Sequence, residues 1–136
     1  MDILKATKYK CSVSSVLNKD VKQFGKSFMF DGEEDTSWSS DQGQPQWITI
    51  QFEEPQTIER FRFQFQGGFA GNEGGVTIHG ADGACLYDKA FYPEDINAVQ
   101  MFPLDGRVEG ATKVKFTFKS STDFFGRIIV YKLELS

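Results

Sequence analysis

The stretch Phe28–Phe52, FMFDGEEDTSWSSDQGQPQWITIQF, combines an acidic turn, a polar loop and a strand. In its last part, Ile48, Ile50 and Phe52 alternate with polar residues, which is the pattern of a strand with one buried face. Asp31-Gly32 is a turn dipeptide, because a short carboxylate bonds local backbone and glycine tolerates positive φ. The stretch therefore predicts a loop that leads into a half-buried strand.

Carboxylates crowd the turn between Asp31 and Asp35. Oxygen donors this dense are able to surround calcium, which takes about 6–8 oxygen ligands. An EF-hand is excluded, because its loop needs glycine at position six and glutamate at position twelve, whereas Gly32 follows Asp31 directly. The alternative is an acidic surface turn, with Trp38 packed into the core. If a metal binds here, its other ligands come from elsewhere in the chain.

Length and composition favour one β-rich domain over residues 1–136. The chain is 40% hydrophobic and 25% charged, which is typical of a globular protein, and its 14 phenylalanines favour strands. The net charge of −4 argues against direct nucleic-acid binding, which depends on Lys and Arg at phosphates. The amino-terminal residues MDILKATKYK contain no long apolar run, so we expect no signal peptide and no membrane span.

Short strands separated by turn signals run along the chain. About eight strand segments are predicted, at residues 12–17 (a short strand or a turn), 47–52, 61–65, 76–79, 85–92, 99–104, 114–118 and 128–135. Between them, the sequence predicts a break at residues 53–55, a bulge near Glu59 and Arg60, a glycine-rich flexible loop at residues 67–75 and a turn at residues 105–106. The pattern predicts an all-β, antiparallel jelly-roll β-sandwich whose binding residues lie on end loops.

The motifs of common enzymes are absent from the sequence. There is no GxSxG, HExxH or GxxxxGK motif, and we expect the one histidine, His79, at the surface. Cys11 and Cys85 are expected to be reduced thiols, and with one histidine they cannot supply a closed zinc site. Because no nucleophile–base pair can be named, we expect a protein that is not an enzyme.

Binding chemistry is more plausible near the last strand. Phe124 and Phe125 are adjacent, and neighbours in an extended segment point to opposite sides, so one of them is an exposed anchor beside Arg127. In the alternative, the segment bends, both rings pack, and Arg127 pairs with Asp123. Phe69 in the glycine-rich loop is a second candidate anchor. A sugar site would use the same chemistry, with Arg127, Gln66 or Asp41 as polar partners.

The order of Asp31-Gly32, Thr36-x-Trp38-x-Ser40 and Gln46-Trp47-Ile48 before a strand resembles the discoidin, or galactose-binding-like, family. The resemblance covers nearly the whole chain. It implies the jelly roll that the strand pattern also predicts.

A set of segments between residues 14 and 127 resembles a narrower family of small nuclear-receptor-associated proteins. These segments are SSVLNKDVKQFGK, FDGEEDTSW, SDQGQPQW, FQGGF, FYPED and TDFFGR. This resemblance implies a nuclear and also cytoplasmic protein that contacts a protein partner, such as an orphan nuclear receptor, and represses receptor-mediated transcription.

The discoidin resemblance also implies one structural calcium ion. Carried onto this chain, its ligands are the Asp31 carboxylate, both oxygens of Thr36, the backbone carbonyls of Phe28 and Glu33, and a carboxylate from the last strand, Glu134. Such an ion would join the acidic loop to the last strand.

The sequence thus predicts a protein-interaction domain with its contact surface on the end loops. The residues expected there are Gln66, Phe69, Asp123, Phe124, Phe125 and Arg127. The alternative is a carbohydrate-binding module that uses the same loops.

Overall fold

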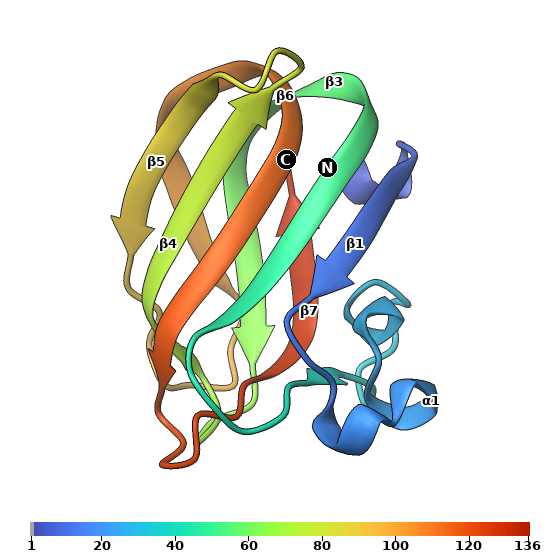
Figure 1. Ribbon diagram of the computed structural model, residues 1–136, viewed down its shortest axis with the longest axis vertical. Helices are drawn as coiled ribbons and strands as arrows, with labels where there is room; N and C mark the ends of the chain where they lie inside the picture. Colours follow the sequence, from blue (N-terminus) through green and yellow to red (C-terminus); the bar gives the residue numbers. More distant parts are fainter. Residues whose placement is uncertain (1) are drawn as a thin grey trace.

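Seven strands and four short helical turns build the structure, a computed structural model that describes residues 2–136 (Figure 1). The strands are β1 (Tyr9–Val13), β2 (Trp38–Ser39), β3 (Gln46–Phe65), β4 (Gly71–Gly80), β5 (Cys85–Phe91), β6 (Gln100–Ser121) and β7 (Ile129–Leu135). The helical turns are η1 (Ile3–Lys5), η2 (Leu17–Lys19), α1 (Val21–Phe24) and η3 (Lys26–Met29). The predicted all-β, antiparallel class is confirmed.

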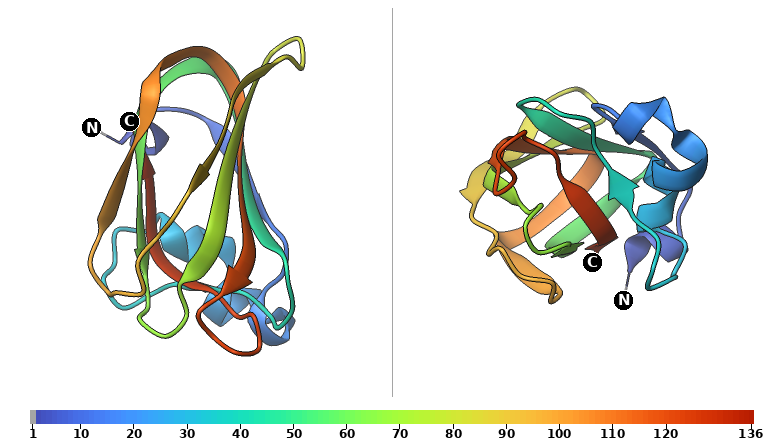
Figure 2. Two further views of the ribbon diagram at one scale, coloured as in Figure 1. Left: turned by 90° about the vertical axis from the view of Figure 1, so that its left-hand side faces the viewer. Right: turned by 90° about the horizontal axis from the view of Figure 1, so that it is seen from below.

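Two long strands, β3 and β6, pass through both layers of the sandwich (Figure 2). Their first contact places Ile48 opposite Phe116 in a layer that also holds β1, β4 and β5. Their second contact places Phe61 opposite Phe102 in a layer that also holds β7 and β2. All pairings are antiparallel. Because β3 and β6 run through both layers, the two layers form one continuous jelly-roll sheet.

The prediction of about eight strands is close to the seven observed, but two predicted interruptions lie inside continuous strands. Pro55 falls within β3, and Gly106 falls within β6 with φ of 111°. The two strands bend together there, with register shifts between Gln51 and Gln56 and on to Arg60. A bulged pair accommodates proline and glycine without ending the strands. The predicted bulge near Glu59 and Arg60 is confirmed.

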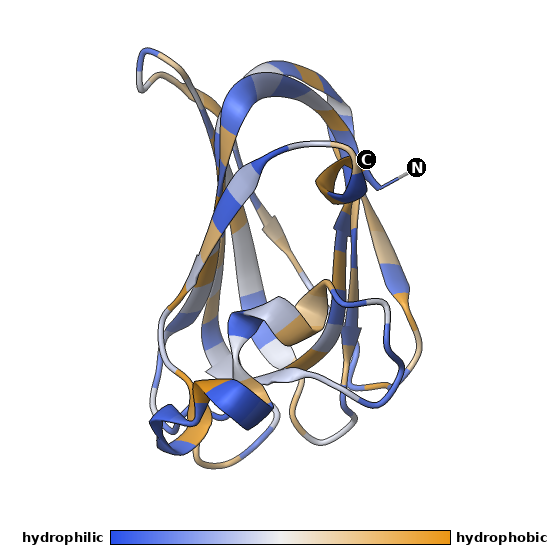
Figure 3. Cartoon of the chain, turned by 90° about the vertical axis from the view of Figure 1, so that its right-hand side faces the viewer, coloured by the Kyte–Doolittle hydropathy of each residue, from blue (hydrophilic) through white to orange (hydrophobic). Residues whose placement is uncertain are grey.

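The core is built mainly from phenylalanine rings on β3 and β6. Phe61, Phe63 and Phe65 are buried along β3, and Phe116 and Phe118 are buried opposite them on β6. Phe63 stacks on Phe65 at 5.2 Å and meets Phe116 edge-on at 5.0 Å. Such pairs add about 0.5–1.5 kcal/mol beyond their area burial. The alternation appears in Figure 3 as hydrophilic and hydrophobic bands along the strands.

The predicted flexible loop at residues 67–75 is wrong beyond its first few residues, because β4 already begins at Gly71. Glycines are needed there for close approach of aromatic rings. A Cβ on Gly71 would lie 2.4 Å from Phe118, and one on Gly74 would lie 2.8 Å from Phe91. The glycine run is therefore part of the sheet and leaves room for core rings.

Candidate functional site

Four loops meet at one end of the sandwich, the lower end in Figure 1 and the end facing the viewer in the right panel of Figure 2. They are residues 41–45, 66–70, 92–99 and 122–128, and together we call them the end-loop surface. Hydrogen bonds join all four loops; the Thr122 hydroxyl, for example, accepts from the Ala70 N–H at 3.0 Å and donates to the Asp95 carboxylate at 3.2 Å. The surface is therefore a fixed arrangement of side chains on a rigid sandwich.

The 122–128 loop is held in a tight turn by its own residues. The Ser121 hydroxyl donates to the carbonyl of Arg127 at 2.6 Å and accepts from the backbone N–H of Asp123 at 3.0 Å. Gly126 has φ of 85°, and a Cβ there would lie 2.7 Å from the carbonyl oxygen of Gly43. The Gly43 N–H in turn donates to the Phe125 carbonyl at 2.9 Å. These bonds fix the backbone that carries the two phenylalanines.

Both adjacent phenylalanines of this loop are exposed. Phe124 is 90% exposed and Phe125 is 54% exposed, and their rings meet edge-on at 5.3 Å. The sequence predicted one exposed ring, and the structure exposes both; their role as binding anchors stays a prediction. Exposed rings on a rigid backbone lose little conformational freedom on binding, so they are suitable contact residues.

The guanidinium of Arg127 lies between two aromatic rings. It is 5.4 Å from the ring centre of Phe69 and 5.8 Å from that of Phe125. Its Nε donates to the Asp123 carboxylate at 3.2 Å, and its backbone N–H donates to the same oxygen at 3.1 Å. The Arg127–Asp123 pair of the alternative interpretation is thus present, although neither ring is buried.

The ion pair lowers the pKa of Asp123. Partial burial opposes the ionised carboxylate, but the hydrogen bonds and charge of Arg127 outweigh that effect, so the pKa of Asp123 lies below its ordinary value of 3.8. Asp123 is therefore ionised at neutral pH and holds Arg127 in place.

The 66–70 loop is fastened to residues that the sequence did not single out. The N–H of Gly68 donates to the Asp95 carboxylate at 2.7 Å, and the N–H of Gly67 donates to the Asn97 side chain at 2.7 Å. Gln66 accepts from the Tyr131 hydroxyl at 3.0 Å, so its side-chain oxygen serves the fold. Asp95 entered the sequence analysis only as part of the segment FYPED, and nothing in that segment specifies a partner 27 residues away.

Phe69, predicted as an exposed anchor, is half-buried. Its N–H donates to the Gln66 carbonyl at 2.9 Å, and its carbonyl accepts from Ile129 at 3.0 Å. The Phe69 ring packs near the Arg127 guanidinium, and Phe124 and Phe125 are the more accessible rings.

A buried glutamine holds the 41–45 loop. The Gln46 amide donates to the carbonyls of Asp41 at 3.2 Å and Gly43 at 2.9 Å, while its oxygen accepts from the hydroxyls of Ser14 and Ser15. Asp41 therefore lies at the rim of the surface and is fixed through its backbone. Buried polar side chains that are fully hydrogen-bonded in this way add rigidity.

The predicted calcium ligands are brought together only in part. The Asp31 carboxylate accepts from the Thr36 hydroxyl at 2.6 Å and from the N–H of Glu33 at 3.0 Å. Phe28 lies half-buried in η3, close in sequence to this turn. The oxygen donor type fits calcium, and the predicted side-chain ligands Asp31 and Thr36 meet, whereas Glu33 reaches Asp31 through its N–H and not through its carbonyl. Within residues 2–136 there is no cluster of three His, Cys, Asp or Glu side chains arranged for a metal.

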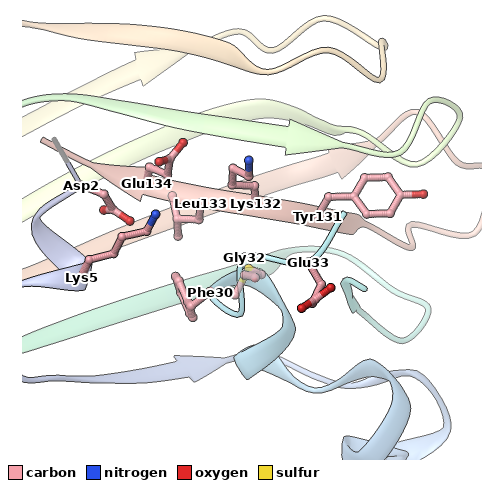
Figure 4. Close-up of a pocket in the computed structure, with 10 residues that line it drawn as sticks. Asp2, Lys5, Phe30, Gly32, Glu33, Tyr131, Lys132, Leu133 and Glu134 are labelled. Atoms are coloured by element: carbon pink, nitrogen blue, oxygen red, sulfur yellow. The ribbon is translucent and has the colours of Figure 1, made fainter. Parts of the chain in front are cut away.

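The fifth predicted ligand, Glu134, lines a pocket of about 120 Å³ between η1, the acidic loop and β7. Figure 4 shows Glu134 and Asp2 at one end of this pocket, with Glu33 beside Gly32 on the opposite wall. Asp31 is not among the residues that line it. A calcium ion held by both Asp31 and Glu134 would therefore need the acidic loop to move towards β7.

Other predicted features of the chain are also visible. Trp38 is fully buried and donates to the Ser15 carbonyl at 2.9 Å, so the expected core position is confirmed. Cys11 and Cys85 are free thiols, as predicted. No helix within residues 2–136 is both long enough and apolar enough to cross a membrane.

Sequence comparison relates the chain to one domain family and to a group of curated proteins. Residues 10–126 match the F5/8 type C domain family. The chain is 49% identical over 123 residues to the nuclear receptor 2C2-associated protein of Danio rerio, which covers 90% of this chain and 86% of that protein. It is 42% identical over 125 residues to the Homo sapiens protein of the same name, covering 90% and 87%.

Structure comparison finds similar folds among carbohydrate-binding modules. The chitosan-binding module 1 of a Paenibacillus sp. IK-5 chitosanase/glucanase has a TM-score of 0.76 at 18% identity, covering 100% of this chain and 98% of that chain. A Clostridium perfringens module in complex with GalNAc-beta-1,3-galactose has a TM-score of 0.75 at 17% identity, covering 93% and 94%. At such identities the similarity shows the fold.

Proposed function

The chain belongs to the F5/8 type C domain family, within the group of nuclear receptor 2C2-associated proteins, and from this premise we propose that it is a non-enzymatic protein-interaction domain. Its proposed partner is a nuclear receptor, as the name of its relatives suggests. We further propose that it represses receptor-mediated transcription and that it acts in the nucleus and also in the cytoplasm.

The exposure of Phe124 and Phe125 carries this proposal. Large exposed aromatic rings are uncommon on a free surface and are frequent binding hot spots, each able to cost about 2 kcal/mol or more on truncation. Here they stand on a hydrogen-bonded turn beside Arg127, another frequent hot-spot residue. The contact surface is accordingly the end-loop surface, with Phe124 and Phe125 at its centre.

Two titratable groups with shifted pKa values also support a non-enzymatic role. Burial raises the pKa of the Cys11 thiol to about 12, against a smaller opposing effect of Lys26, which is the reverse of an activated nucleophile. The ionised carboxylate of Asp123 is engaged by Arg127 and supports the loop. Neither group is poised to transfer a proton at neutral pH.

The proposal is tested by capture from nuclear extract with immunodetection of nuclear receptor 2C2. Wild type is compared with the double variant Phe124→Ala/Phe125→Ala, and Val21→Ala, which is 64% exposed elsewhere on the chain, is the matched control. We expect receptor with wild type and the control, and a loss with the double variant. Equal capture by all three proteins would move the contact surface away from the end loops.

A carbohydrate-binding function is the second candidate, and the placement of Arg127 between Phe69 and Phe125 favours it. An aromatic face beside a planar hydrogen-bond donor is suited to a sugar ring, and the similar solved structures include modules described as binding chitosan or a galactose disaccharide. A glycan array, followed by titration of any hit against Arg127→Ala, distinguishes the two functions. A saturable sugar signal that is lost in Arg127→Ala would favour the second.

We also propose that calcium binds at the acidic loop, with Asp31, Thr36 and the backbone carbonyls of Phe28 and Glu33 as ligands and Glu134 recruited from β7. The ion would be structural and would join this loop to the last strand. An ion that binds only the folded state at 100 times its Kd adds about 2.7 kcal/mol to stability.

This calcium site predicts a melting temperature that rises when calcium is added and falls when it is chelated. The rise should be absent in Asp31→Ala and retained in Glu53→Ala, which removes an exposed carboxylate from β3. Differential scanning calorimetry of the three proteins measures both effects. An unchanged rise in Asp31→Ala would exclude this ligand set.

A further inference from the structure

The layer that holds β1, β4, β5 and the paired halves of β3 and β6 is drawn in front in Figure 1. Its outer face carries a row of lysines. Along β6, Lys113, Lys115 and Lys119 point outward, because they alternate with buried core residues of the same strand. Lys113 lies opposite Gln51 and His79, and Lys115 lies opposite Thr49 and Thr77. Acidic residues directly opposite such lysines would stabilise the row. Neither Lys113 nor Lys115 has an acidic residue directly opposite it in the sheet.

These lysines take part in none of the ion pairs found within residues 2–136. Lys10 adds a fourth positive charge on β1, where it lies opposite Gln51. The carboxylates on this face are Asp88, opposite Thr77, Glu73, which accepts from the Ser120 hydroxyl at 3.2 Å, and the exposed Glu53, two residues after Gln51 on β3. A chain of net charge −4 thus has an outer sheet face on which lysines outnumber carboxylates.

Next to the lysine row lies an open hollow of about 290 Å³. The floor of the hollow is formed by small residues at three paired positions, which leave the space above them open. They are Thr117 on β6, Gly75 on β4 and Ala90 on β5. Tyr92, which is 75% exposed, and Lys119 stand at the edge of the hollow. A Cβ on Gly75 would meet no atom within 4 Å, so the hollow is open to a side chain from outside.

We propose that this outer sheet face is a second docking surface, and that its occupant is an extended acidic segment of a partner protein with one large apolar side chain. The carboxylates of the segment pair with Lys113, Lys115 and Lys119, and the apolar side chain fills the hollow against Tyr92. Of the residues named here, only Tyr92 also belongs to the end-loop surface, and none is a predicted contact residue of that surface.

The spacing along β6 supports an extended peptide as the ligand. Lys113, Lys115 and Thr117 are successive outward positions of β6. An extended peptide that lies along β6 has the same rise per residue, so every second side chain of the peptide lies over one of these positions. Two acidic residues at alternating positions followed by a large apolar residue therefore fit two lysines and the hollow. An acidic residue at the next alternating position reaches Lys119.

Nucleic acid fits this face less well than an acidic peptide does. Single strands bind along continuous basic grooves with several aromatic platforms, whereas Glu73 and Asp88 border this hollow and would repel phosphates. Tyr92 is the one aromatic ring that lines the hollow. The other ring near the lysine row is that of Trp47, which lies opposite Thr117 and 5.3 Å from Lys115 Nζ. A peptide can place its carboxylates over the lysines and leave the hollow to an uncharged side chain.

The test uses a fluorescent peptide, Glu-Gly-Glu-Gly-Phe-Gly-Glu, titrated against the full chain at low salt. Gly75→Val fills the hollow from inside, and it should fold as well as wild type because the backbone is extended and the site is open. We expect about tenfold or more weaker binding by Gly75→Val and by Lys113→Gln/Lys115→Gln/Lys119→Gln. The charge-matched control Lys5→Gln/Lys19→Gln/Lys22→Gln should bind like wild type.

Further arms define the ligand class and separate this surface from the first one. A peptide with Gln in place of Glu should bind more weakly, and Phe124→Ala/Phe125→Ala should bind the acidic peptide like wild type. No binding of the acidic peptide, equal binding by Gly75→Val, or tighter binding of an oligothymidylate or of phosphatidylserine vesicles than of the peptide would overturn the proposal.

Discussion

Gly71 and Gly75 lie four residues apart in β4, yet their surroundings differ. A Cβ on Gly71 would lie 2.4 Å from the Phe118 ring, whereas one on Gly75 meets open space. We therefore expect Gly71→Ala to lower the free energy of unfolding by about 1–3 kcal/mol, because it overpacks the core. Urea unfolding of both alanine variants measures the difference.

Gly75→Ala is the internal control for this prediction. It should leave stability unchanged or raise it slightly, because alanine restricts the unfolded chain and meets no atom in the folded one. Equal losses in both variants would mean that strand flexibility, and not contact with Phe118, decides the effect.

The two cysteines should differ in their reaction with thiol reagents. Burial raises the pKa of Cys11 to about 12, and only the thiolate reacts, so Cys11 should be labelled slowly at neutral pH. Cys85 is exposed on β5 and should be labelled first. Iodoacetamide labelling followed by peptide mass spectrometry measures both rates, and faster labelling of Cys11 would contradict its placement against the core.

Some residue positions were predictable because the rule is local. The rule that adjacent aromatics of an extended segment cannot both enter one core predicted one exposed ring, and both Phe124 and Phe125 are exposed because the segment forms a turn. The roles of Asp95 and Asn97 were not predictable, because their hydrogen bonds reach residues 27 and 30 positions away. Nothing in the local sequence specifies such partners.

At the scale of elements, the 122–128 loop depends on one ionised carboxylate. The pKa of Asp123 is lower in the folded protein than its ordinary value of 3.8, so the stabilisation by the Arg127 pair is complete above that value. It is lost as the pH falls through the lower, folded-state pKa. Asp123→Asn, which cannot ionise, should therefore melt below wild type at neutral pH, and the gap should close in acid.

Melting temperatures of both proteins between neutral pH and about pH 2 test this dependence. Hydrogen exchange of residues 122–128 should show the same trend, with the loop opening earlier than the sheet. A gap that stays constant across the acid range would mean that the hydrogen-bond geometry of Asp123, and not its charge, holds the loop.

Strands were predicted well where alternation was regular and poorly where a long strand bends. Residues 61–65 and 114–118 alternate strictly, and both lie inside observed strands. Pro55 and Gly106 are ordinary signals of a strand end, but here they lie at bends that β3 and β6 share. Only the pairing of two distant segments reveals that the chain continues through such signals.

At the scale of the whole molecule, the sandwich presents two surfaces of different chemistry. The end-loop surface offers exposed aromatic rings beside an arginine that is ion-paired with Asp123. The outer sheet face offers a hollow beside lysines that form none of the ion pairs found within residues 2–136. The sequence predicted the jelly roll and several residues of the first surface. It did not predict the second, because the hollow arises from small residues on three strands that meet only in the folded sheet.

Calorimetric titration of purified nuclear receptor 2C2 with this protein tests the central claim most directly. The account predicts a saturable heat with wild type and with Val21→Ala. In Phe124→Ala/Phe125→Ala it predicts binding weaker by about 2 kcal/mol or more, with an unchanged melting temperature. Equal affinity of the folded double variant would contradict the claim that the end-loop surface is the receptor contact, and no heat with any of the proteins would contradict the receptor as the partner.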